Sequence, residues 1–242
     1  MPVLALLAGG RATRLYPLTE RMPKSLVPVA GEPFLAHQLR WLAGQGVRDV
    51  VICCGHLAGP VREFAGDGER FGVSVRYSEA GDRALGTGGA VRHALPLLGE
   101  KFLVMYGDSL LTAPLGAMWE AFCEQLCRGM MAVYRNEDRW DASNVEIGDG
   151  RVVRYEKGRR RAGLTHIDYG ISAFHSEAFA RIPDGRVFDL GLVFQELIEC
   201  GGLACHEVRE RFYEVGSFAG LSETEAMLRQ AECDLGPAGA SA

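Results

Sequence analysis

Three basic residues near the start of the chain could neutralise the charge of a phosphate group. Arg11 and Arg14 follow the glycine pair Gly9-Gly10, and Lys24 comes ten residues after Arg14, between two prolines whose fixed φ angles stiffen its surroundings. Adjacent glycines let backbone N–H groups approach an anion closely, and the arginines add charge that a turn does not need. Taken singly, the glycines could form a tight turn and Lys24 could be a surface lysine. Their combination indicates a site for a phosphate-bearing ligand.

Two further segments carry polar groups that could complete such a site. Asp108 follows the apolar run 102–106 after one glycine, and a carboxylate at a strand end suits Mg²⁺, which prefers oxygen ligands. A strand-end cap is the alternative. Gly86 and Thr87 precede a predicted helix, where backbone amides and a hydroxyl could meet a base or a ribose. The alternative there is that Thr87 caps the helix N-terminus.

An α/β core is expected to position these residues. Apolar runs that predict strands alternate with candidate helices, the strands at residues 3–7, 50–54, 73–77 and 102–106 and the helices at 33–43, 58–65 and 88–98. This alternation predicts a doubly wound, mostly parallel, Rossmann-like sheet covered on both faces. Gly9-Gly10 and Asp108 would then both follow carboxyl ends of strands, where such sheets place their ligands.

After Asp108 the pattern changes to α+β. Helices are expected at 115–127, 189–200 and 218–232, and strands at 130–134, 144–147, 151–156 and 166–174. Gly148-Asp149-Gly150 predicts a hairpin turn between two of these strands. We expect one domain over residues 1–235, divided at residue 112 into a first half (1–112) and a second half (113–235), followed by a disordered tail at 236–242.

Composition narrows the class of protein. The chain has 242 residues, 48% of them hydrophobic and 24% charged, with a net charge of -5. No apolar run approaches the ~20 residues of a membrane helix, and no basic stripe suits a nucleic-acid backbone. The run Arg159-Arg160-Arg161 is either a solvated loop or a patch near an anionic substrate. The apolar start lacks a basic flank, which favours a buried strand over a signal peptide. We therefore expect a cytoplasmic location.

The cysteines and histidines suggest no site of their own. Seven cysteines are an odd number, and no Cys-x-x-Cys or His pairing completes a metal site. Buried thiols are expected instead. No Ser-His-Asp or Cys-His arrangement organises the motifs, and none of the six histidines falls within them.

The motifs together resemble those of a known family. Residues 7–29 match, almost throughout, the opening pattern of the sugar-phosphate nucleotidyltransferases: Leu-Ala-Gly-Gly, a short gap, Thr-Arg-Leu-x-Pro-Leu-Thr, then Pro-Lys-x-Leu-x-Pro-Val. Further matches follow at Leu85-Gly86-Thr87-Gly88-Gly89-Ala90, Tyr106-Gly107-Asp108-Ser109, Glu156-Lys157 and Tyr213-Glu214-Val215-Gly216-Ser217. The chain resembles the NDP-sugar pyrophosphorylase type, and most of all the compact members that activate mannose-like, heptose or N-acetylmuramic acid phosphates.

The resemblance implies a reaction and roles for the first half. A nucleoside monophosphate would pass from a nucleoside triphosphate to a sugar 1-phosphate, with release of pyrophosphate. Arg14 and Lys24 would hold the triphosphate and the reacting α-phosphate, and Asp108 would hold Mg²⁺. The nucleotide-binding residues would be Leu7, Ala8, Gly9, Gly10, Gly86 and Thr87. A sugar 1-phosphate, with a second pKa of roughly 6, is largely dianionic at neutral pH and could attack without a general base.

For the second half, the resemblance implies a sugar-phosphate site with some departures. Glu214 stands where the family has a second metal-binding Asp, and its side chain is longer by one methylene. Asp168-Tyr169 replaces the familiar Asn-Ala before a glycine, which suggests an acceptor other than glucose or N-acetylglucosamine. The sugar-phosphate residues would be Asn144, Glu156, Lys157 and Gly170.

Two other functions stay open at this point. The first is a nucleotidyltransferase for a non-sugar phosphate, such as phosphocholine or a phosphonate. The second is a non-catalytic regulatory subunit that binds nucleotide sugars, suggested by Glu214 and the altered Asp168-Tyr169 segment. The base, the sugar and whether the chain forms a homo-oligomer are also open.

Overall fold

The computed structural model describes residues 1–10, 13–55, 57–81, 83–158 and 161–235. Arg11, the arginines at 159 and 160, and the tail at 236–242 lie outside these residues. The described helices are α1 (Phe34–Gly44), α2 (Ala58–Ala65), α3 (Gly86–Leu98), α4 (Gly116–Glu124), α5 (Leu190–Glu199) and α6 (Phe218–Leu235). The strands of the main sheet are β1 (Leu4–Leu7), β4 (Asp49–Cys54), β5 (Ser74–Glu79), β6 (Lys101–Tyr106), β8 (Gly129–Arg135), β9 (Val145–Gly148), β10 (Arg151–Tyr155), β11 (His166–His175) and β12 (Leu203–Val208).

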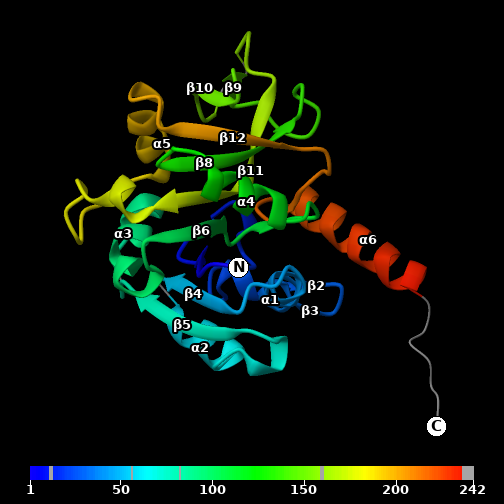
Figure 1. The fold of residues 1–242 in the computed structure, drawn as a ribbon. Coiled ribbons are helices and arrows are strands. Elements are labelled where there is room, and N and C mark those ends of the chain that lie inside the picture. The colour runs from blue at the N-terminus through cyan, green and yellow to red at the C-terminus, as the bar shows by residue number, and fades with distance from the viewer. Residues whose placement is uncertain (11–12, 56, 82, 159–160, 236–242) are drawn as a thin grey trace.

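These nine strands form one sheet within the described residues, in the order β5-β4-β1-β6-β11-β8-β12-β10-β9 (Figure 1). The first four are parallel to one another, as the alternating pattern predicted. β11 then pairs antiparallel with β6 and joins the two predicted halves in a single sheet. The protein therefore has an α/β fold.

The second half departs from the expected mostly parallel sheet. β8 and β12 are parallel, whereas β11, β10 and β9 pair antiparallel with their neighbours. β9 also pairs with β11, so the strands from β11 to β9 close on themselves. The sheet as a whole is mixed because β11 runs antiparallel to both β6 and β8, and the predicted hairpin of β9 and β10 adds a further antiparallel pair. Its turn is confirmed, since Asp149 and Gly150 have φ angles of 50° and 72°, as a tight hairpin turn requires.

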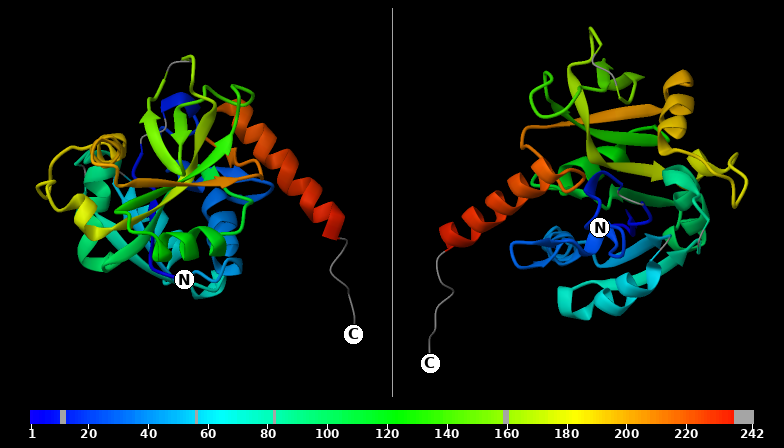
Figure 2. Two further views of the ribbon diagram at one scale, coloured as in Figure 1. Left: turned by 45° about the horizontal axis from the view of Figure 1, so that its top comes forward. Right: turned by 180° about the vertical axis from the view of Figure 1, so that it is seen from behind.

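Helices cover both faces of the sheet. Successive strand residues point to opposite faces, so Leu4 and Leu6 of β1 join one buried cluster and Ala5 joins another. Residues of α1, α2 and α4 belong to the first cluster, and residues of α3 and α5 to the second. In α1, Leu35, Leu39 and Leu42 are fully buried at helical spacing. α6 projects away from this body (Figure 2).

Two small strand pairs lie outside the main sheet. One joins β2 (Pro28–Val29) to β3 (Glu32–Pro33), and the other joins β7 (Ser109–Leu110) to β13 (Tyr213–Glu214). The second pair places Glu214 opposite Ser109, the residue after Asp108. The pairing thus brings together Glu214 in β13 and Asp108, which directly precedes β7.

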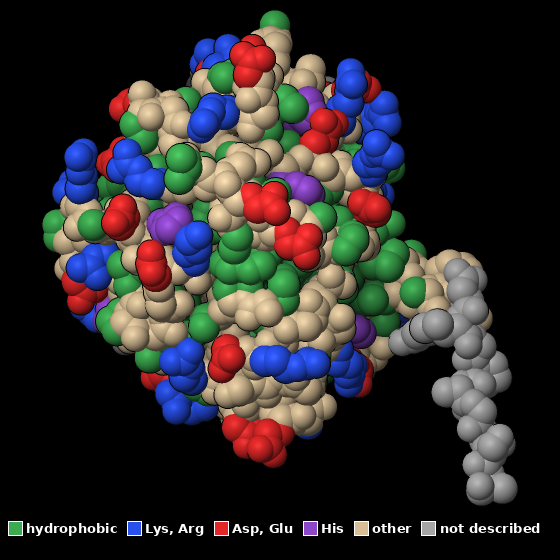
Figure 3. Space-filling model, in the orientation of Figure 1, with side chains coloured by type: hydrophobic (Ala, Val, Ile, Leu, Met, Phe, Trp, Pro, Cys, Tyr) green, Lys and Arg blue, Asp and Glu red, His purple; other side chains and the backbone are tan. Residues whose placement is uncertain are grey.

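None of the helices in the described part of the chain combines the length and apolar character needed to cross a membrane. On the face drawn in Figure 3, acidic and basic side chains are interspersed.

Candidate active site

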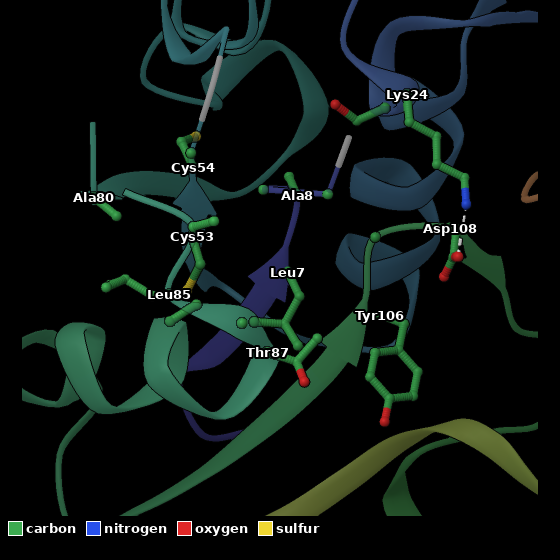
Figure 4. Close-up of a pocket in the computed structure, with 18 of the residues that line it drawn as sticks. Leu7, Ala8, Lys24, Cys53, Cys54, Ala80, Leu85, Thr87, Tyr106 and Asp108 are labelled. Atoms are coloured by element: carbon green, nitrogen blue, oxygen red, sulfur yellow. Dashed lines mark hydrogen bonds and ion pairs between the residues drawn. The ribbon is translucent and has the colours of Figure 1, made fainter. Parts of the chain in front are cut away.

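A cavity of about 360 Å³ lies at the carboxyl ends of β1, β4 and β6, beside the N-terminus of α3 (Figure 4). Its walls include every residue predicted to bind nucleotide and two of the three predicted catalytic residues. These are Leu7, Ala8, Gly9, Gly10, Gly86, Thr87, Lys24 and Asp108. The remaining walls are largely apolar or backbone, including the thiols of Cys53 and Cys54. Segments far apart in the sequence therefore share one concave site.

Lys24 and Asp108 face each other at one end of the cavity. The Lys24 Nζ donates to Asp108 Oδ2 at 2.7 Å, and the side chains are 14% and 35% exposed (Figure 4). Lys24 begins a short 3-10 helix between the two prolines. Gly107 brings the end of β6 close to β1, since its N–H donates to Leu7 O at 3.0 Å and a Cβ there would overlap that carbonyl. The glycine before Asp108 thus has a packing reason.

The side chains of Arg14 and Glu214 lie close to Lys24 around Gly216, although they come from other segments of the chain. A Cβ placed on Gly216 would lie 2.9 Å from Arg14 Nη2 and 3.1 Å from Lys24 Nζ, and would overlap Glu214 Oε2. Glu214 Oε2 accepts from the Gly216 N–H, and its Oε1 accepts from Ser217 Oγ at 2.7 Å. Two cations and a carboxylate therefore surround one glycine, next to the pair of Lys24 with Asp108.

The donor set fits a divalent cation that is shared with substrate. Among the described residues, no group of three or more His, Cys, Asp or Glu side chains could hold a metal. Asp108 and Glu214 are two hard carboxylates held close by backbone, because Val215 N donates to Asp108 O at 2.9 Å. Mg²⁺ is commonly held by one or two carboxylates, with phosphates and water as its other ligands. To hold such a cation, Asp108 would have to give up its pairing with Lys24, and Glu214 the hydrogen bonds within its own loop.

The glycine-rich segment begins α3 rather than preceding it, so Gly86 and Thr87 lie in the first helical turn. Cβ atoms at Gly86 and Gly89 would overlap the carbonyls of Phe188 and Arg186. The glycines therefore allow α3 to pack closely on the connection that leads into α5. This contact is a structural reason for the glycines, in addition to their place at the cavity.

Thr87 does not cap its own helix. Its Oγ1 accepts from Leu190 N at 2.8 Å and donates to Asp189 Oδ2 at 3.2 Å, which ties it to the start of α5. The alternative interpretation of Thr87 as the N-cap of α3 was wrong. Its side chain still borders the cavity.

The predicted sugar-phosphate residues lie outside the 360 Å³ cavity. Asn144 Oδ1 accepts from Asp168 N at 2.9 Å, and Glu156 pairs with Arg161 at 2.9 Å. Lys157 Nζ lies 5.8 Å from the ring centre of Tyr106, which lines the cavity. Lys157 is thus the member of the set with a described contact to a residue of the cavity wall.

Gly170, the fourth member, is constrained by its surroundings. Its φ of +96° favours glycine, and a Cβ there would lie 2.7 Å from Ser109 Oγ. A residue with a side chain would therefore disturb the strand that follows Asp108. The requirement for glycine is explained by packing, independently of any ligand.

A buried acid that the motifs did not assign lies behind Tyr106. Asp168 Oδ2 accepts from the hydroxyls of Tyr106 and Tyr155, at 3.2 and 3.4 Å, and Oδ1 accepts from Gly170 N at 3.0 Å. Burial raises the pKa of Asp168, although these hydrogen bonds and Lys157 act against the shift. The sequence marked Asp168 as a departure from the family pattern and as a single acid inside the apolar run 166–174, but neither signal gave it a role.

Comparison with known proteins identifies the family. The model of the nucleotidyl transferase family matches residues 4–227, a span that contains the whole cavity wall and Gly216. The chain belongs to this family. Membership of the nucleotidyl transferases confirms the resemblance inferred from the motifs.

Similar nucleotidyl transferases differ in length. N-acetylmuramate alpha-1-phosphate uridylyltransferase of Neisseria meningitidis is 30% identical, over 92% of this chain and 96% of its own. Glucose-1-phosphate thymidylyltransferase of Streptomyces antibioticus is 30% identical, over 90% of this chain but 63% of its own. For UTP–glucose-1-phosphate uridylyltransferase of Synechocystis, at 27% identity, the matched region is 55% of that protein. The chain thus spans only part of some relatives and nearly all of another.

A solved structure supports the fold. A putative glucose-1-phosphate thymidylyltransferase from Bacillus anthracis, in complex with sucrose, superposes with a TM-score of 0.83 at 24% identity, covering 93% of this chain and 94% of that one. This likeness shows that the architecture is shared.

Proposed function

We propose that this nucleotidyl transferase joins a nucleoside triphosphate to a sugar 1-phosphate and releases pyrophosphate. One observation carries the proposal: Arg14, Lys24 and Glu214 surround Gly216, and Lys24 also contacts Asp108 at the end of a cavity large enough for a nucleoside. Phosphoryl-type transfer asks mainly for alignment and for neutralisation of charge. Guanidinium and ammonium groups supply both without forming a covalent intermediate.

The acceptor class is supported by the second half and by the relatives. The relatives from Neisseria meningitidis and Streptomyces antibioticus are both named for sugar 1-phosphate substrates. In this chain, Lys157 is a cation near the Tyr106 wall of the cavity, on the side where the second half meets the first. We assign Lys157 to the sugar phosphate, with Asn144, Glu156 and Gly170 around the sugar. The cavity itself is assigned to the nucleotide.

The proposed reaction is a direct in-line displacement. A phosphate oxygen of the sugar 1-phosphate forms a bond to the α-phosphorus, and the bond from that phosphorus to the oxygen bridging to the β-phosphate breaks. The electron pair leaves with pyrophosphate. Arg14 and Lys24 orient the triphosphate and offset the charge on the α-phosphate oxygens. The attacking phosphate is already ionised at neutral pH, so no residue has to accept its proton.

A divalent cation, which we propose to be Mg²⁺, fits Asp108 and Glu214. When bound there with the triphosphate, it would neutralise phosphate charge and help the leaving group depart. The chain would supply the two carboxylates. For Lys24 to bind a substrate phosphate, its ammonium has to give up its ion pair with Asp108. A cytoplasmic location, a homo-oligomer and the division of the domain at residue 112 stay predictions.

A substrate matrix tests the proposal. Pyrophosphate release is measured with ATP, CTP, GTP, UTP and dTTP against glucose, mannose, heptose and N-acetylmuramic acid 1-phosphates, phosphocholine and a phosphonate, with Mg²⁺ present. The expected result is release with at least one sugar 1-phosphate, and release about 10²–10³-fold slower from a Lys24→Ala protein prepared identically. Release with phosphocholine or the phosphonate alone would favour a non-sugar acceptor. Triphosphate binding without release for any pair would favour a regulatory subunit.

A further inference from the structure

The carboxylate of Asp189 contacts both sides of the proposed reaction site. It belongs to the N-cap residue of α5, and its Oδ1 accepts from Gly191 N at 2.7 Å. The same oxygen lies 3.3 Å from Lys157 Nζ. Its other oxygen, Oδ2, accepts from the Thr87 hydroxyl at 3.2 Å. One side chain therefore connects the lysine of the second half with the first turn of α3, which borders the cavity.

From this arrangement we propose that Asp189 is a positioning residue that holds Lys157 in a fixed relation to α3, ready for the phosphate of the acceptor. The proposal rests on the proposed function, because it assigns Lys157 to the sugar 1-phosphate. It adds a residue that belongs to none of the sequence motifs described above.

Backbone contacts fix the position of Asp189 relative to α3. Phe188 N donates to Leu85 O at 2.8 Å, and Gly89 N donates to Phe188 O at 3.0 Å. Leu190 N donates to Thr87 Oγ1 at 2.8 Å. The residues on either side of Asp189 are thus bonded to the start of α3. The backbone that carries the Asp189 carboxylate is therefore fixed in place relative to α3.

Lys157, the other member of the ion pair with Asp189, has fewer contacts that fix its position. It follows β10, and 47% of its side chain is exposed. Its Nζ lies 5.8 and 5.9 Å from the ring centres of Tyr106 and Tyr155, which places the ammonium against two aromatic faces as well as the carboxylate. A lysine held in this way loses less conformational freedom when a phosphate binds. An ammonium group has three N–H donors, so one can stay with Asp189 while others reach the phosphate.

The charge of Asp189 supports this role at neutral pH. Burial alone would raise the pKa of Asp189, but hydrogen bonds from Gly191 and Thr87 and the nearby Lys157 ammonium outweigh burial and lower it. The carboxyl group is therefore ionised where the reaction would run. An ionised group both orients the ammonium and caps α5.

Capping alone is the simpler explanation of Asp189, and substitution separates the two roles. Asn is about as good an N-cap as Asp, since its side-chain oxygen can accept from the same backbone N–H. Asp189→Asn therefore keeps the cap and removes the charge that attracts Lys157. Asp184→Asn is a matched control, because Asp184 is an exposed acid in the same connection and pairs with His93 instead.

The experiment measures steady-state kinetics with the substrate pair that wild type uses best. Asp189→Asn is expected to raise the KM for the sugar 1-phosphate about three- to tenfold, in the range of coupling within one hydrogen-bond network. The KM for the nucleoside triphosphate and the melting temperature should stay near wild type, as should all parameters of Asp184→Asn. In a Lys157→Ala background, Asp189→Asn should have no further effect on the sugar 1-phosphate KM.

Two outcomes would overturn the inference while the proposed function stands: an unchanged sugar 1-phosphate KM in Asp189→Asn, or an increase of the same size with and without Lys157. Calorimetric binding of the sugar 1-phosphates gives a second readout that needs no turnover, and Asp189→Asn should weaken it by the same factor. Wild-type protein that neither turns over nor binds any sugar 1-phosphate would refute the proposed function and the inference together.

Discussion

Gly216→Ala is expected to displace the charged side chains that surround this glycine. The added Cβ would lie 2.9 Å from Arg14 Nη2 and 3.1 Å from Lys24 Nζ, and would overlap Glu214 Oε2. Non-bonded contacts to carbon are normally about 3.5 Å, so each cation has to move by about 0.5 Å and the carboxylate has to turn away. A misplacement of about 1 Å can reduce a rate about 10²-fold. We therefore expect kcat to fall about 10- to 100-fold.

Folding should be affected much less, because the displaced atoms are the ends of flexible side chains and Gly216 does not have a positive φ. A penalty of about 1 kcal/mol would lower the melting temperature by about 2–4 °C. The assay combines pyrophosphate release at saturating substrates with thermal melting followed by circular dichroism. Gly116→Ala is the control, since a Cβ on that first residue of α4 meets no atom within 4 Å. Wild-type kcat in a folded Gly216→Ala protein would refute the idea that Arg14 and Lys24 contribute to the reaction from their positions beside Gly216.

The remaining predictions concern single groups. Lys24→Ala should lower kcat about 10²–10³-fold in the same assay, and Asp108→Asn should shift the Mg²⁺ dependence of the initial rate to higher concentration; an unchanged rate or titration would contradict the respective role. Burial raises the pKa of Asp168 above 3.8, so the folded protein keeps a proton that the unfolded chain releases. The free energy of unfolding should therefore fall as pH rises from 3.8 through that raised pKa, and urea titrations of Asp168→Asn should lack this slope. Burial also raises the pKa of Cys53 and Cys54 to about 12, so alkylation mapped by mass spectrometry should be far slower at both than at the exposed cysteines.

The first half of the fold could be predicted because its sequence repeats one physical pattern. Apolar strands alternate with helices, and parallel strands bring their carboxyl ends to one edge. That rule alone placed Asp108 near the opening loop, and the structure joins it to Lys24 across 84 positions of sequence. The start of α3 was predicted two residues late, at 88 instead of Gly86. Glycines at a helix start resemble a loop when the segment that packs on them is unknown.

The second half could be predicted less well because its order depends on packing. β12 was missed, since His206 and Glu207 interrupt its apolar pattern. The contact between Thr87 and Asp189 spans 102 positions and follows from close approach of α3 and α5, which no local pattern encodes. Glu214 was found only through the family motif. The strand pairing that places Glu214 opposite Ser109 is seen only in the structure.

The charge balance around Gly216 links the ligand-free arrangement to the proposed reaction. Among the described residues there, the two cations Arg14 and Lys24 are matched by the two carboxylates Asp108 and Glu214, so this cluster has little net charge to offer a triphosphate. Asp108 is the more exposed partner of its ion pair, at 35% against 14% for Lys24. Of these two side chains, Asp108 would therefore be the more accessible to a cation that binds with the nucleotide. Once Asp108 has a different partner, the ammonium of Lys24 is available to phosphate. The proposed function therefore predicts that nucleotide binding and release of Lys24 are coupled, because the same carboxylate serves both.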